Sequence, residues 1–85
     1  MCMHRHIYIE DKAEIENLKC MVFFLARQYE MLGVVQNCRG NCILADVQGN
    51  DANVIEFQKA LLGMIASVTI EETPPLETCH ALRIG

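Results

Sequence analysis

The chain has 85 residues, enough for one small domain with a modest hydrophobic core. Apolar residues make up 52% of the sequence and charged residues 21%, a balance typical of a globular domain and not of a disordered chain. The formal net charge is -4 and no basic cluster occurs, which argues against nucleic acid or an anionic membrane surface as the main partner. We therefore predict a single domain over residues 1–85.

The sequence also lacks the usual signs of export. Its longest apolar run, MVFFLA at residues 21–26, is far shorter than the roughly 20 residues of a membrane span. The N-terminal stretch has no apolar core of a signal peptide. Five cysteines are present, namely Cys2, Cys20, Cys38, Cys42 and Cys79. An odd number excludes a complete disulfide framework, so we predict reduced thiols and a cytoplasmic location, with Cys20 buried among apolar neighbours.

The first predicted element is a half-buried strand. Polar and apolar side chains alternate over residues 4–10, which is the period of a strand with one face in the core. Ile7 and Ile9 would face the core, and His6 and Tyr8 would lie on the other side.

The next segment has the strongest periodicity in the chain. Asp11 and Glu14 are three positions apart, a spacing typical of a capping box at the start of a helix. Apolar side chains then recur at alternating steps of three and four, which predicts a buried stripe on a helix of about five turns. The stripe consists of Ile15, Leu18, Val22, Leu25, Tyr29 and Leu32. Gly33 marks the predicted end of this helix.

Four more elements follow. Residues 34–36 and 42–48 are predicted strands, joined by a turn in which Gly40 supplies unusual backbone angles. A second helix comes next, with a predicted buried face of Val54, Phe57, Leu61 and Met64. Residues 66–71 alternate as a strand, and residues 80–84 form a short last strand.

The predicted order is therefore β-α-β-β-α-β with an extra C-terminal strand. Two helices on one face of a four-stranded antiparallel sheet satisfy this order, because each element then buries its apolar side against the other layer. We predict an α+β fold of the ferredoxin-like (split β-α-β) class, a two-layer sandwich.

Residues 26–49 resemble the acylphosphatase family, including the acylphosphatase-like domain at the N-terminus of hydrogenase-maturation carbamoyltransferases. The resemblance is carried, in order, by Ala26, Gly33, Val34-Val35, Asn37, Gly40 and Gln48-Gly49. Gly40 falls one place earlier than in the family, and Val34 stands where the family has a tryptophan. The resemblance implies an acylphosphatase-like fold and, as ligand, a small phosphorylated carboxylate.

The resemblance also assigns candidate site residues. In the family, a glycine-containing loop, GxVQGVxFR, follows the first strand; its backbone N–H groups and its arginine hold a phosphate. The family's asparagine orients the attacking water. Carried over by position, Asn37 and Lys19 become the catalytic candidates, with Lys19 standing where the arginine belongs. Lys19 and Arg39, at the hairpin tip, are the candidate phosphate-binding residues.

The phosphate loop itself is not recognisable in this sequence. Residues 13–19 read AEIENLK, without glycine, and continue the apolar stripe of the predicted helix. Acidic residues surround the start of that helix, namely Glu10, Asp11, Glu14 and Glu16. At an effective dielectric near 20, one like-charge contact at about 4 Å costs on the order of 4 kcal/mol. We therefore expect acyl-phosphate hydrolysis to be lost or strongly reduced, with Asn37 serving as a turn former.

The alternative to catalysis is a non-catalytic protein-interaction or ligand-sensing module. One face of the predicted sheet carries no helices, and His6, Tyr8 and Leu44 would lie there. A protein partner, or a second copy of the chain, would dock on this open face or on an edge strand.

The histidines and cysteines raise the question of a metal. His4 and His6 would share one strand face, which permits a common ion. Cys38 and Cys42 flank the hairpin turn at the other end of the sheet, so no set of four ligands converges. We therefore predict no metal site and no cofactor.

Overall fold

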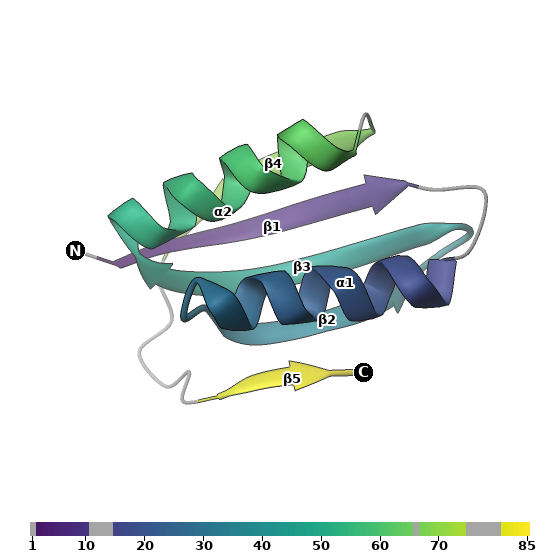
Figure 1. The fold of residues 1–85 in the computed structure, drawn as a ribbon, viewed down its shortest axis with the longest axis horizontal. Helices are drawn as coiled ribbons and strands as arrows, with labels where there is room; N and C mark the ends of the chain where they lie inside the picture. The colour runs from purple at the N-terminus through teal and green to yellow at the C-terminus, as the bar shows by residue number, and fades with distance from the viewer. Residues whose placement is uncertain (1, 11–14, 66, 75–80) are drawn as a thin grey trace.

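The computed structural model describes residues 2–10, 15–65, 67–74 and 81–85. Its element order confirms the predicted one (Figure 1). The elements are β1 (Cys2–Glu10), α1 (Ile15–Gln28), β2 (Leu32–Cys38), β3 (Cys42–Asn50), α2 (Asp51–Met64), β4 (Val68–Thr73) and β5 (Leu82–Ile84). Neither helix in these ranges is long and apolar enough to cross a membrane. Asp11, Glu14, Ala66 and residues 75–80 were part of the sequence predictions and lie outside the described ranges.

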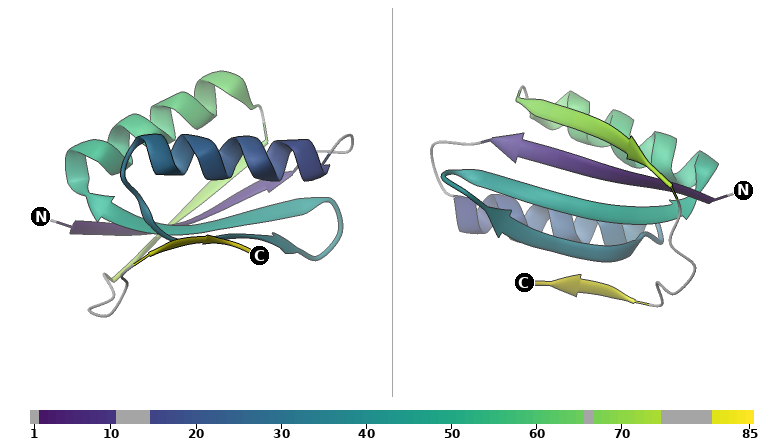
Figure 2. Two further views of the ribbon diagram at one scale, coloured as in Figure 1. Left: turned by 60° about the horizontal axis from the view of Figure 1, so that its bottom comes forward. Right: turned by 180° about the vertical axis from the view of Figure 1, so that it is seen from behind.

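The strands form one sheet in the order β4-β1-β3-β2-β5. The pairs β1–β3, β1–β4 and β2–β3 are antiparallel, whereas the short β5 runs parallel to β2 at the edge. Both helices cover the same face of this sheet, and the other face carries none (Figure 2). The predicted two-layer, ferredoxin-like α+β sandwich is confirmed, with the extra strand making the sheet mixed.

The core fills the space between the sheet and the helices. Ile7 and Ile9 are fully buried, as the alternation in β1 predicted, and they lie opposite Ala45 and Ile43 of β3. The helices contribute Leu18, Val22, Ala26, Val54, Phe57 and Leu61, all with less than a tenth of their surface exposed. The apolar residues that repeat along each element therefore meet in a single layer.

Two side chains were predicted to be buried and are exposed. Met64 ends α2 with 52% of its surface exposed, because it is in the last helical turn, beyond the buried Leu61. Cys20 is exposed on α1 since it lies two positions after the buried Leu18, which is about half a helical turn away.

The end of α1 also differs from the prediction. The helix ends at Gln28, and Glu30 adopts a left-handed conformation with φ 57°. The Met31 N–H donates to the Ala26 carbonyl (2.9 Å) and the Glu30 N–H to the Arg27 carbonyl (3.1 Å), the pair of bonds that defines a Schellman motif. A glutamate thus takes the position where a glycine was expected.

Gly33 has a different role, inside β2. Its φ is +130°, and a Cβ on this residue would lie 1.9 Å from the carbonyl oxygen of Asp46 on β3. Only glycine allows the two strands to approach this closely. Gly33 therefore sets the pairing of β2 with β3 beside Asp46.

We expect Gly33→Ala to lower the free energy of unfolding by at least about 2 kcal/mol, because backbone atoms, not a flexible side chain, block the new methyl group. Gly63→Ala is the matched control. Gly63 lies in α2 with no atom within 4 Å of an added Cβ. This control should gain up to about 1 kcal/mol from helix propensity. Urea unfolding of both variants measures the difference, and equal stabilities would contradict the close approach.

Candidate functional site

Asn37 and Lys19, the candidate catalytic residues, belong to the helix-covered side of the sheet. The prediction of Asn37 as a turn former is wrong, because Asn37 lies in β2, paired with the buried Ile43, and its own side chain is exposed. Because side chains alternate along a strand, Asn37 shares its face with the buried Val35. Lys19 lies in the second turn of α1.

Lys19 is hydrogen-bonded to the C-terminal end of the described chain. Its Nζ donates a hydrogen bond to the Gly85 carbonyl (2.8 Å), and the Gly85 N–H donates to the Val35 carbonyl (2.9 Å). Asn37 is two residues further along β2. The structure thus places Lys19 and Asn37 toward the same end of β2, while giving the lysine a structural role between helix and edge strand.

Arg39 lies in the exposed turn between β2 and β3. Its neighbour Gly40 has φ +73°, which confirms the unusual backbone predicted for this turn. No bond from the Arg39 side chain positions it for an anion in the described contacts.

The segment aligned with the phosphate loop is helical where it is described. Helix α1 begins at Ile15, so the last five residues of AEIENLK, residues 15–19, are helix as predicted. In an α-helix the N–H of residue i donates to the carbonyl of residue i−4, so the Lys19 N–H is directed to Ile15 and away from any ligand. Ala13 and Glu14 lie outside the described residues.

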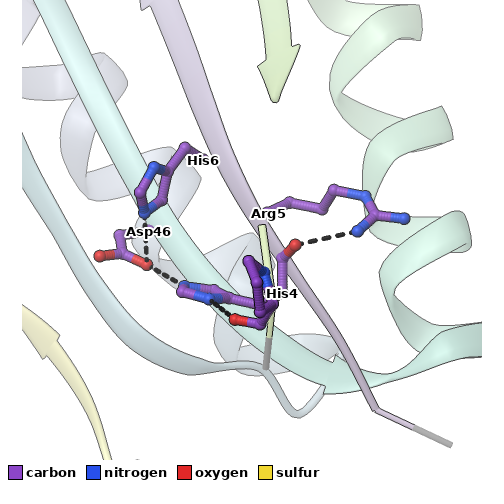
Figure 3. Close-up of polar contacts among 5 residues, drawn as sticks. His4, Arg5, His6 and Asp46 are labelled. Carbon is purple, nitrogen blue, oxygen red and sulfur yellow. Dashed lines mark hydrogen bonds and ion pairs between the residues drawn. The ribbon is translucent and has the colours of Figure 1, made fainter. Parts of the chain in front are cut away.

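A polar cluster on the open face of the sheet was not predicted as a unit. His4 and His6 share one face of β1, as expected, and the residue directly opposite His6 on β3 is Asp46. The three side chains converge (Figure 3). Asp46 alternates with the buried Ala45 and Val47, which identifies its face from sequence, but its partner depends on strand register, which the sequence does not reveal.

Asp46 bridges the two imidazoles. Its Oδ1 contacts Nε2 of His4 in a short hydrogen bond and lies 3.4 Å from Nε2 of His6. His4 is 4% exposed, which is unusual for a polar side chain on a sheet face without helices. Its Nδ1 lies 2.9 Å from the Pro74 carbonyl oxygen, at the end of β4.

These contacts determine how His4 carries its protons. The Pro74 carbonyl can only accept, so Nδ1 of His4 is a donor. In neutral His4 the lone pair of Nε2 would therefore face the Asp46 carboxylate, which also only accepts. Nε2 and the carboxyl oxygen can therefore be joined by one shared proton or by a metal ion. One ligand atom from each of His4, His6 and Asp46 lies within 4.8 Å of the others, so these residues could hold an ion.

The prediction of reduced cysteines is wrong for one pair. Cys38 and Cys42 form a disulfide with a Cα–Cα distance of 5.1 Å. They face each other as the last pair of the β2–β3 hairpin, where antiparallel pairing brings the two Cβ atoms close. An odd cysteine count excluded a full framework but not this single local bridge. Cys2 and Cys20 are free thiols.

No family model matches the sequence, and no curated protein matches it. Solved structures do resemble it. Full-length HypF in a phosphate- and nucleotide-bound form has a TM-score of 0.83 at 18% identity; the match covers 100% of this chain and 12% of HypF, so the chain spans about an eighth of that protein. The acylphosphatase from Bacillus subtilis gives 0.82 at 18% identity, covering 100% of this chain and 99% of that one. An acylphosphatase from Coxiella burnetii gives 0.83 at 15%, covering 99% and 93%. The chain has the acylphosphatase fold, which confirms the predicted resemblance at the level of fold.

We expect Asp46→Asn to lower the free energy of unfolding by about 1–2 kcal/mol, because a charged acceptor for the buried His4 is replaced by a neutral one. Glu72→Gln is the control. It removes an ion pair with Arg5 at 3.6 Å in which the glutamate is 83% exposed, and such pairs contribute less than about 1 kcal/mol. Urea unfolding with a chelator present measures the free energy of unfolding of both variants. A loss for Glu72→Gln as large as for Asp46→Asn would contradict this ranking.

Proposed function

We propose that this domain keeps the acylphosphatase fold and hydrolyses acyl phosphates weakly or not at all. The observation that carries the proposal is the start of α1 at Ile15. Residues 15–19, which the resemblance aligns with the end of the phosphate loop, are wound into a helix. The backbone N–H of Lys19, the last of these residues, is directed to the Ile15 carbonyl within the helix, so it does not point at a phosphate as a loop amide would.

The charges support the same proposal. Lys19 takes the place of the family's arginine, and an ammonium lacks the planar fork that binds two phosphate oxygens at once. Its Nζ already donates to the Gly85 carbonyl. Glu10, at the end of β1, is exposed where the phosphate loop of the family begins, and its carboxylate repels an incoming anion.

Any remaining activity would use few groups. Lys19 would screen the charge of a small phosphorylated carboxylate, Asn37 would position the attacking water, and Arg39 would meet the anion at the hairpin turn.

The test is the release of phosphate from a simple acyl phosphate by the purified, metal-free protein. We expect no turnover above spontaneous hydrolysis. The Lys19→Arg variant should not gain activity, because a guanidinium restores the bidentate contact to phosphate but not the backbone N–H donors of the family's phosphate loop. Asn41→Ala, in the same exposed turn as Arg39, is the matched control for Asn37→Ala. Turnover that disappears in Asn37→Ala and persists in Asn41→Ala would overturn the proposal.

The second candidate function is a non-catalytic binding module that uses the open sheet face. It is favoured by the His4–His6–Asp46 cluster, which lies on that face and has no counterpart in the family pattern quoted above. The open face, or the edge strands β4 and β5, would also be the docking surface for a protein partner or a second copy.

A further inference from the structure

We propose that His4, His6 and Asp46 form a binding site for one divalent transition-metal ion, with Zn²⁺ the best match to the ligands. Imidazole nitrogens and a carboxylate oxygen are zinc ligands, and two histidines with one carboxylate are a known catalytic type of set, with a fourth position open to water. The metal ion is the ligand that we propose for the open face of the sheet. The inference rests on the second candidate function and not on the fate of acyl phosphates.

The distances suit such an ion. The three ligand atoms all lie within 4.8 Å of one another, and two of them, on His4 and Asp46, are already in hydrogen-bond contact. In a tetrahedral site with ligands about 2.0–2.2 Å from zinc, neighbouring ligand atoms are about 3.3 Å apart. The His6–Asp46 separation of 3.4 Å is close to this value. The His4 and Asp46 ligand atoms lie closer together than two ligands of one zinc ion, so this contact must open when the ion binds.

A second observation independently points to a metal: the other ring nitrogen of His4 is already oriented. Nδ1 of His4 donates to the Pro74 carbonyl (2.9 Å), which directs the Nε2 lone pair toward His6 and Asp46. Metal-binding histidines almost always donate their second N–H to a carbonyl or carboxylate in this way, and the bond fixes the tautomer and the ring. His4 is 4% exposed, so its ring is also held by packing.

The surrounding charge also suits a cation. A divalent ion can contact the His4 Nε2 lone pair and the Asp46 carboxylate together and engage His6 as well. Glu71 of β4 is paired with His6 on the same face and adds negative charge nearby, within a domain of net charge -4.

The strands hold the ligands in place. His4 and His6 lie two residues apart on β1, and Asp46 lies opposite His6 on the adjacent β3. Ligands on paired strands inside a sheet are positioned more firmly than ligands on loops. Strand alternation puts the site on the opposite face of the sheet from Asn37, and Lys19 belongs to α1, which covers the face of Asn37, so the two proposals are structurally separate.

The experiment is a calorimetric titration of metal-free protein with Zn²⁺, repeated with Co²⁺ to read the coordination geometry from its visible spectrum. We expect one Zn²⁺ per chain and a tetrahedral Co²⁺ spectrum. His6→Gln and Asp46→Asn should each weaken binding by at least about tenfold. His6→Gln leaves the His4–Asp46 contact intact, so it remains informative if Asp46→Asn folds poorly.

Two controls separate this site from others. His80→Asn removes the third histidine, which lies outside the described residues, and Cys2→Ser removes the free thiol that precedes His4. Both should bind Zn²⁺ like the parent chain. Absence of binding, binding unchanged in His6→Gln, or binding lost in Cys2→Ser would overturn the site. Hydrolysis is measured without metal, so failure here leaves the acyl-phosphate result unaffected.

Discussion

The antiparallel register between β1 and β3 determines which side chains lie opposite each other on both faces of the sheet. On the helix side it sets Ile7 against Ala45 and Ile9 against Ile43, all fully buried. On the open side the same register sets His6 against Asp46. Because side chains alternate with a period of two, a slip by one residue would move every core side chain to solvent and separate the polar cluster. The register that buries the core therefore also brings His6 and Asp46 together.

The helix side shows that the acylphosphatase fold forms here without the family's GxVQGVxFR sequence. An acylphosphatase-like sandwich requires the sheet and the two apolar helix faces, and those are present here. It does not require a phosphate-binding sequence between β1 and α1, and in this chain α1 begins at Ile15. Lys19 then stands on a helical surface with its Nζ bound to the Gly85 carbonyl. Fold similarity at 18% identity is thus compatible with a different function on the other face of the sheet.

The sequence predicted burial correctly where the spacing of apolar residues along a strand or helix decides which face is in the core. The alternation around Ile7 and Ile9 and the helical stripe through Val22 predicted the layers, because burial of apolar surface is the largest favourable term. Glycine was less informative, since it serves several purposes. Gly40 supplies a turn conformation, whereas Gly33, read as a helix end, permits contact with the Asp46 backbone.

Pairs that are distant along the chain could not be predicted. Asp46 was assigned to the right face, but its position opposite His6 follows from register. The Cys38–Cys42 bridge likewise depends on hairpin pairing that counting cysteines does not reveal. The most direct measurement is the pattern of cross-strand nuclear Overhauser effects between β1 and β3. The β1–β3 register predicts contacts that align His6 with Asp46, and contacts that align His6 with Ala45 or Val47 would exclude this register.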